Sequence, residues 1–242
     1  MEQSRGHQHP LSKMITEING IFAELGFVFA DGPEAETEHY NFDQLNVPKD
    51  HPSRDMQDTF WFKDKDVSES MVLRTHTSPV QSRYLEAHNN ELPVRVIVPG
   101  KVFRNEATDA THEAQFFQLE GLYVGEGIHL GHLKGTLEYF FSKFFNGETE
   151  VRFRPSFFPF VEPGVEVDMM LKGSESKLAN KWIEIMGAGM MHPNVLRAAG
   201  VDPQRYSGFA FGMGIDRLAV MKYGINDIRD LYTGDLRFVT QF

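Results

Sequence analysis

Two stretches of the chain repeat apolar residues at the three- and four-residue spacing of an amphipathic helix. The first begins at Pro10 and is closed by Gly26, and the second is followed by Asn146-Gly147. Each stretch carries one apolar stripe, which predicts a helix that packs either on the protein core or on another subunit. The apolar members are Leu11, Met14, Ile15, Ile18, Phe22 and Leu25 in the first, and Leu130, Leu133, Leu137, Phe140, Phe141 and Phe144 in the second.

The remaining pattern consists of short runs that favour β-strands. The run VRVIV at 94–98 predicts a strand that ends at Pro99-Gly100, and 208–224 predicts a strand, a glycine turn and a helix. Other strands are expected at 59–62, 71–74, 102–106, 114–124, 150–154, 157–161, 165–170 and 182–186. Residues 31–59 predict an irregular excursion, and 172–181 an exposed hairpin loop. Many strands with few helices favour an α+β fold, a mainly antiparallel sheet flanked by helices.

Composition narrows the class of protein. With 242 residues and 41% hydrophobic content, the chain predicts one domain at 10–242 that follows a flexible segment at 1–9. No apolar run reaches the length of a membrane span, so no membrane partner is expected. The absence of cysteine excludes disulfide and thiolate chemistry and agrees with a cytoplasmic location. The net charge of −10 excludes a general basic coat for nucleic acid.

Polar residues gather in FRNEATDATHEAQFFQLEG at 103–121. Because side chains on a strand alternate between faces, Arg104 and Glu106 lie on one face of the first strand. Phe116, Gln118 and Glu120 likewise lie on one face of the second strand. If the two strands pair as a hairpin, all five point the same way. Such a face could bind phosphate or carboxylate, stack a base and receive an ammonium group. A solvent-exposed face of salt bridges is the simpler alternative.

A second candidate lies in the glycine turn before the last predicted helix. Gly212 and Gly214 allow a tight turn, and Arg217 falls in the first turn of the helix that follows. A helix N-terminus together with a guanidinium favours an anion. Arg217 could equally form an ion pair with Asp216.

Two further segments supply side chains of other kinds. Phe158 and Phe160 are two residues apart, so they share a strand face that could pack an aromatic ligand or the core. Glu162, just beyond them, could bind Mg²⁺ or remain a surface carboxylate. In RTHTSP, His76 and Ser78 lie on one side if the chain is extended, where both could hydrogen-bond a polar ligand.

Together these segments are similar to a known family. FRNE…FQLEG resembles motif 2 of the class II aminoacyl-tRNA synthetases, and GFAFGMGIDR resembles motif 3. The segments RTHTSPVQ, DATHEAQFFQLEG, FFPFVEPG, GAGMMHPNVL and YGINDIRDL resemble the α subunits of bacterial phenylalanyl-tRNA synthetases. The resemblance spans roughly residues 6–242, and its FFPFVEP and RTHTSP segments are the ones that indicate which amino acid is used.

The resemblance implies a reaction and its partners. It implies a catalytic core that uses ATP and Mg²⁺ to convert phenylalanine to phenylalanyl-adenylate, then transfers the phenylalanyl group to tRNA(Phe). It also implies a larger β subunit and an α2β2 heterotetramer. The long coiled-coil arm with which the family's α subunits usually begin is expected to be absent from this chain. The alternatives are a catalytically inactive binding or regulatory module with the same fold, and a class II ligase for another substrate.

The resemblance also implies a role for each candidate residue. Arg104 and Arg217 would be catalytic, on the α- and γ-phosphates of ATP. The other implied ATP contacts are Glu106, His112 and Phe116. The implied amino-acid contacts are Trp61, His76, Ser78, Gln118, Glu120, Phe158, Phe160 and Ala210. Glu162 would be the Mg²⁺ ligand.

Overall fold

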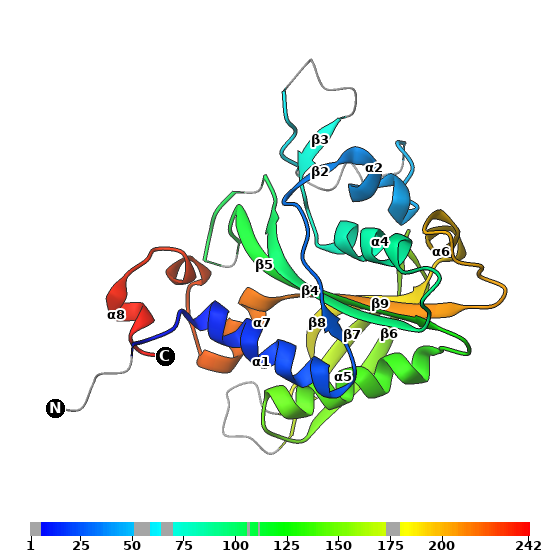
Figure 1. The fold of residues 1–242 in the computed structure, drawn as a ribbon. Helices are drawn as coiled ribbons and strands as arrows, with labels where there is room; N and C mark the ends of the chain where they lie inside the picture. The colour runs from blue at the N-terminus through cyan, green and yellow to red at the C-terminus, as the bar shows by residue number, and fades with distance from the viewer. Residues whose placement is uncertain (1–5, 51–58, 64–69, 106, 111, 173–179) are drawn as a thin grey trace.

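The computed structural model describes residues 6–50, 59–63, 70–105, 107–110, 112–172 and 180–242 (Figure 1). Its centre is a seven-stranded sheet in the order β1-β4-β5-β9-β8-β7-β6. The strands are β1 Val28–Phe29, β4 Val94–Phe103, β5 Gln115–Gly125, β6 Thr149–Phe158, β7 Val161–Leu171, β8 Ile183–Met191 and β9 Ser207–Gly214. Only the β1–β4 pair is parallel among these neighbours, so the prediction of a mainly antiparallel α+β fold is confirmed.

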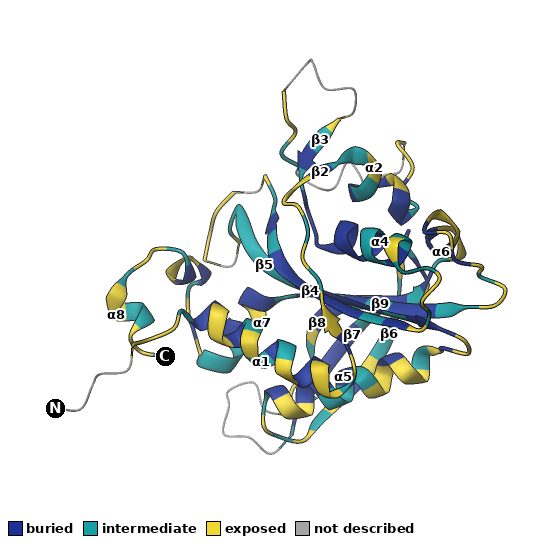
Figure 2. Cartoon of the chain, in the orientation of Figure 1, coloured by how far each residue is buried: buried dark blue, intermediate teal, exposed yellow. Residues whose placement is uncertain are grey.

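Three helices cover one face of the sheet (Figure 1). They are α1 Pro10–Glu24, α5 Leu130–Phe144 and α7 Ile215–Tyr223. Their apolar stripes meet in the larger core, where the ring of Phe22 lies 4.8 Å from that of Phe140 and 5.5 Å from that of Phe211. Figure 2 shows these stripes buried against the sheet. Both predicted helices therefore exist, and their apolar faces form the core of this chain.

The opposite face is covered by shorter elements. These are α4 Ser78–Ala87, α6 Pro193–Ala198, the small sheet of β2 Ala35–Thr37 and β3 Met71–Leu73, α2 Glu38–Asn41 and the 3-10 turn η1 Asp43–Leu45. A second core joins α4 and α6 to the sheet. These short elements do not fill the whole face, and a cavity lies between them and the sheet.

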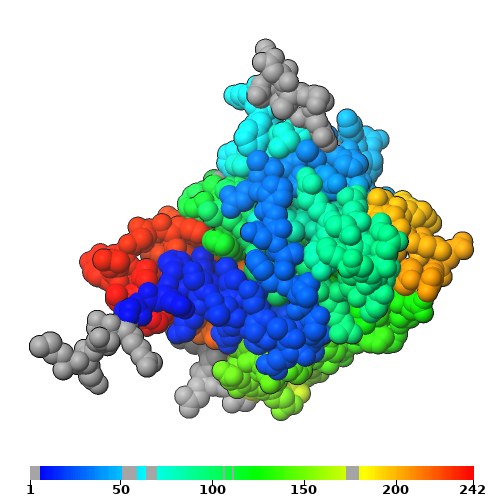
Figure 3. All heavy atoms as spheres, in the orientation of Figure 1, coloured from blue at the N-terminus to red at the C-terminus, as the bar shows by residue number. Residues whose placement is uncertain are grey.

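The last residues of the chain lie beside its beginning. They form η2 Ile228–Leu231 and α8 Leu236–Val239, and Figure 3 shows them in red against α1 in blue. The Nε2 atom of His9 is 2.9 Å from the carbonyl oxygen of Leu231, which ties the two ends together. No helix in the described ranges is long and apolar enough to cross a membrane.

The predicted break at Pro99-Gly100 is wrong, because β4 runs through it without interruption. Proline lacks a donor, and β1 pairs only with Val96 and Ile97, so no neighbour on that side needs one at Pro99. Gly100 is required by packing, since a Cβ atom there would lie 2.4 Å from Nη2 of Arg74.

Other boundaries also differ from expectation. The four short strands predicted between 150 and 186 are three longer strands, and the one expected at 157–161 contains the β6–β7 turn. Residues 31–59 contain β2, α2 and η1, and Ser78 begins a helix where extended chain was expected. At 59–62 the structure has a single bridge between Trp61 and Val72. Most of the predicted 172–181 loop lies outside the described residues.

Candidate functional site

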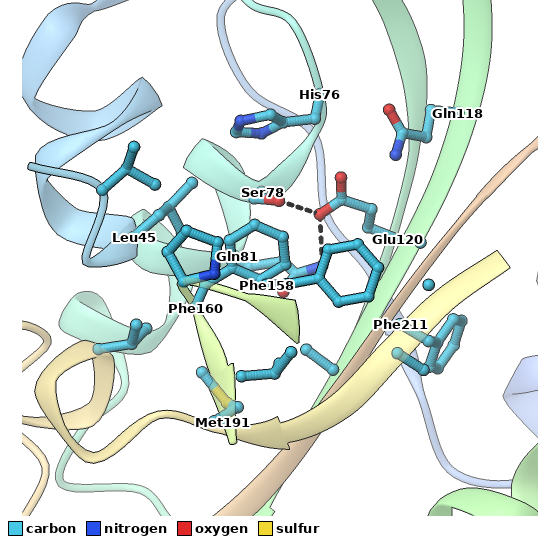
Figure 4. Close-up of a pocket in the computed structure, with 18 of the residues that line it drawn as sticks. Leu45, His76, Ser78, Gln81, Gln118, Glu120, Phe158, Phe160, Met191 and Phe211 are labelled. Atoms are coloured by element: carbon cyan, nitrogen blue, oxygen red, sulfur yellow. Dashed lines mark hydrogen bonds between the residues drawn. The ribbon is translucent and has the colours of Figure 1, made fainter. Parts of the chain in front are cut away.

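A cavity of about 760 Å³ opens on the face of the sheet that α4 covers (Figure 4). Its walls come from β5, β8, β9, the β6–β7 turn, the start of α4 and the segment at 42–47. It brings together, among the predicted site residues, His76, Ser78, Arg104, Gln118, Glu120, Phe158, Phe160 and Ala210. These residues come from five separate stretches of sequence, so only the fold could have joined them.

The pairing of β4 with β5 explains why the polar residues share a face. Gln118 lies opposite Gly100, Glu120 lies opposite Val98, and the N–H of Arg104 donates to the carbonyl of Ala114 at 3.0 Å just beyond the ladder. Arg104 and Glu120 accordingly both line the cavity. The intervening Leu119 is buried in the core on the other face. The predicted common face is therefore confirmed for these residues, while Glu106 lies outside the described residues.

Glu120 is the buried carboxylate of the cavity, with 5% of its surface exposed. It accepts hydrogen bonds from the Ser78 hydroxyl and, at 3.0 Å, from Nε2 of Gln81. Burial raises its pKa to about 7, although the bond from Ser78, the backbone N–H of Thr77 and the charge of Arg74 act in the opposite direction. A desolvated carboxylate of this kind gains from a cationic ligand.

His76 and Gln118 line the cavity, and each carries a buried polar atom. Within the described part of the chain, Nδ1 of His76 and Oε1 of Gln118 have no hydrogen-bond partner. Burial and the charge of Arg104 lower the pKa of His76 to about 3, so its imidazole is neutral. Buried polar atoms are nearly always satisfied in proteins, so these two indicate a polar ligand.

The other end of the cavity is aromatic and apolar (Figure 4). The rings of Phe158 and Phe160 lie 5.9 Å apart with 21° between their planes. The prediction that they share a strand face is wrong, because β6 ends at Phe158 and Phe160 stands in the turn. A Cβ atom on Gly187 would lie 2.9 Å from Cζ of Phe158, so this glycine makes room for the ring. The apolar wall is completed by Val161, Ala188, Met191, Val195, Ala210 and Phe211.

Of the residues expected to contact ATP that the structure describes, Arg104 lines the cavity, whereas His112, Phe116 and Arg217 do not. The ring of Phe116 is 5.0 Å from Cζ of Arg104. Arg217 is exposed in the first turn of α7, whose N-cap Gly214 has no capping side chain. His112 is exposed, with Nδ1 3.1 Å from the carboxylate of Asp109. Their positions leave their role in binding ATP a prediction.

Trp61 and Glu162 are not among the cavity residues. Trp61 stacks on Phe42, at 6.2 Å and 23°, and Phe42 in turn lines the cavity. The side chain of Glu162 is 75% exposed, and its carboxylate is 3.3 Å from Nε2 of His192. The described residues hold no group of three His, Cys, Asp or Glu side chains that could bind a metal.

Several cavity residues were not assigned to the site from the sequence. Gln81 lies one helical turn after Ser78, and recognising α4 from the proline at its start would have placed the two together. Phe42 and Leu45 belong to the stretch expected to be irregular, so nothing local indicated that they close the cavity. Gly212 is needed for space, since a Cβ atom there would lie 3.1 Å from Cγ of Glu120.

Comparison with known proteins shows first the fold and then the family. The crystal structure of pyrrolysyl-tRNA synthetase from Desulfitobacterium hafniense shares the fold with a TM-score of 0.70, over 93% of this chain and 73% of that one. The sequences are 18% identical, so this likeness shows the fold alone. Residues 1–242 match the family of class II tRNA synthetase core domains (F), and the chain belongs to this family.

Individual relatives are more specific. The phenylalanine–tRNA ligase alpha subunit of Macrococcus caseolyticus is 55% identical over 99% of this chain and 67% of its own length. The protein of the same name from Bacillus subtilis is 52% identical over 98% of this chain and 69% of its own length. The resemblance inferred from the motifs is therefore confirmed.

Proposed function

We propose that this chain is the catalytic α subunit of a phenylalanine–tRNA ligase, which forms phenylalanyl-adenylate from phenylalanine and ATP and transfers the phenylalanyl group to tRNA(Phe). One observation carries the proposal. A single cavity joins a buried carboxylate and unsatisfied polar atoms to a pair of stacked aromatic rings. Those two ends complement the ammonium group and the ring of phenylalanine.

The cavity suggests how phenylalanine would bind. Its ammonium group would pair with the carboxylate of Glu120, whose hydrogen-bond donors Ser78 and Gln81 are neutral side chains. It would also donate to Oε1 of Gln118, which has no partner among the described residues. Its ring would pack against Phe158 and Phe160, which aromatic side chains favour in offset or edge-on contacts. Its carboxylate would then point toward Arg104, at the polar end of the cavity.

The chemistry needs charge stabilisation and positioning. A carboxylate oxygen of phenylalanine forms a bond to the α-phosphorus of ATP, the bond to the bridging oxygen breaks, and pyrophosphate leaves with those electrons. Arg104 would stabilise the negative charge that accumulates on the α-phosphate oxygens. No general base is required, because the attacking carboxylate is already ionised. Phe116 would stack the adenine, and Arg217 at the start of α7 would bind the γ-phosphate.

Mg²⁺ is expected with this family, where it would neutralise phosphate charge. Mg²⁺ often takes one or two carboxylates from a protein and the rest of its ligands from phosphate and water. Glu162 is a single exposed carboxylate that is paired with His192 and does not line the cavity. These residues do not form a Mg²⁺ site at the cavity, so no step is assigned to Glu162. Its role as a ligand stays a prediction.

The proposal includes a β subunit in an α2β2 assembly and a cytoplasmic location. The chain has a formal charge of −10, which opposes phosphate binding over a wide surface. A partner that supplies cationic surface for the tRNA is consistent with this charge.

The test is phenylalanine-dependent exchange of pyrophosphate into ATP, measured with the full-length protein and its β subunit. Arg104→Ala should reduce kcat/KM about 100- to 1000-fold, since one preorganised donor is typically worth about 3–4 kcal/mol. Arg205→Ala is the matched control, because Arg205 pairs with Glu126 on the surface away from the cavity. A wild-type assembly without phenylalanine-dependent exchange would favour the inactive binding module.

A further inference from the structure

Asp216 links β5 and α7, the two elements that are proposed to bind the adenine and the γ-phosphate of ATP. The ladder between β5 and β9 ends at the pair Gln118–Gly214, after which the chain turns into α7. The next backbone N–H of β5, that of Phe117, therefore has no strand partner on that side. It donates instead to Oδ2 of Asp216 at 2.7 Å. The side chain of Asp216 thus supplies, one residue beyond the ladder, the acceptor that β9 supplies within it.

The second oxygen of the same carboxylate is also bound. The hydroxyl of Tyr232 donates to Oδ1 of Asp216. Asp216 is 1% exposed, and burial raises its pKa to about 6 while its two hydrogen bonds act in the opposite direction. Each carboxylate oxygen has one donor, so the ionised form fits this arrangement.

Tyr232 is itself held in place by the C-terminal segment. The N–H of Ile228 donates to the carbonyl of Ala110, in the loop that joins β4 to β5, at 3.1 Å. On its other side the segment is bound to His9 through the carbonyl of Leu231, at 2.9 Å. The segment at 228–232 therefore spans from the β4–β5 loop to the start of α1, beside α8 in Figure 1. The side chain of Tyr232 extends from this segment to Asp216.

The hydrogen bond between Phe117 and Asp216 lies next to residues that are proposed to bind ATP. Phe117 stands between Phe116 and Gln118, and Asp216 directly precedes Arg217. We infer that Asp216, supported by Tyr232, is a positioning residue that sets the spacing between the adenine platform on β5 and the phosphate-binding arginine on α7. This inference rests on the proposed function, which places ATP across these two elements.

The strand pairing also predicts which substrate is bound less well when Asp216 is lost. Glu120 pairs with Gly212 inside the β5–β9 ladder, so its place does not depend on Asp216. Phe158 and Phe160 come from β6 and its turn, at the far side of the sheet. Loss of Asp216 should therefore loosen the ATP end and leave the phenylalanine end in place.

The experiment measures KM for ATP and KM for phenylalanine separately, by pyrophosphate exchange with the full-length protein and its β subunit. Asp216→Ala leaves the Phe117 N–H unsatisfied and should raise KM for ATP about tenfold or more, with KM for phenylalanine changed less than about twofold. Asp216→Asn keeps an acceptor of the same shape and should recover most of the loss. Tyr232→Phe should give a smaller rise, again for ATP alone.

Asp235→Asn is the matched control, because Asp235 lies in the same C-terminal region but pairs with Arg237 at the surface. It should leave both KM values within about twofold. Equal rises for both substrates, or an unchanged KM for ATP, would overturn the positioning role while the proposed function stands. If Asp216→Ala does not fold, Tyr232→Phe decides the matter by the same comparison. A wild-type assembly without exchange removes the proposed function and this inference together.

Discussion

Glu120→Gln gives a direct physical test of the cavity, because it removes a charge and keeps the shape of the side chain. Burial raises the pKa of Glu120 from 4.5 to about 7. Each pKa unit corresponds to about 1.4 kcal/mol, so the cost of ionising this carboxylate in the folded protein is about 3 kcal/mol. A neutral glutamine does not bear that cost at any pH.

The sign follows from proton linkage. The folded state holds the Glu120 proton more tightly than the unfolded state, so this group stabilises the fold fully below pH 4.5. That contribution is lost as the pH rises through the folded pKa of about 7. The wild-type protein should therefore lose about 2.5 kcal/mol relative to Glu120→Gln between pH 5 and pH 8.

The assay is urea unfolding of both proteins at pH 5 and pH 8, in the absence of ligand. Comparing the two proteins at each pH cancels other titrating groups, such as Asp216, and any constant effect of the substitution on packing. In thermal unfolding the same change corresponds to about 5–10 °C. A difference between the two proteins that is the same at both pH values would refute the claim that this carboxylate is desolvated.

Three further predictions concern phenylalanine binding. Because the ammonium group of phenylalanine attracts only ionised Glu120, affinity should fall about tenfold per pH unit below pH 7, and calorimetry should show no such dependence in Glu120→Gln. Gly187→Ala places a methyl group 2.9 Å from Cζ of Phe158, so KM for phenylalanine should rise about tenfold or more, with KM for ATP unchanged as the control. Trp61→Ala removes one aromatic contact to Phe42, worth about 1 kcal/mol, so KM for phenylalanine should rise about fivefold; a loss of about 100-fold would place Trp61 in the site itself.

The hydrophobic pattern of the sequence correctly predicted those features that depend on a single helix or strand. The stripes of α1 and α5 repeat at helical spacing, and both helices begin and end within a residue or two of the predicted bounds. The alternation along β5 separates Gln118 and Glu120 from Leu119, and the structure places them on opposite faces. Periodicity predicts such features because it depends only on the geometry of one element.

Pattern failed where neighbouring elements decide the outcome. Pro99 and Gly100 predict a break by local preference, yet β4 continues because β1 is too short to need a donor at Pro99 and Arg74 fills the space beside Gly100. The stretch from 31 to 59 has no strong periodicity, because its α2 and η1 are single turns that are stabilised by packing. Neither fact can be read from one segment.

By itself the sequence determined which polar, charged and aromatic side chains could form the site and on which face of β5 the polar ones lie. It also determined the family to which the chain belongs. Tertiary structure alone decided that Ser78 and Gln81 meet Glu120, that Phe158 and Phe160 stack across a turn, and that Asp216 reaches Phe117. The physical reason is that these contacts join residues far apart in the chain. Their distances, and the desolvation that shifts the pKa of Glu120, exist only after the sheet and its covering helices have packed.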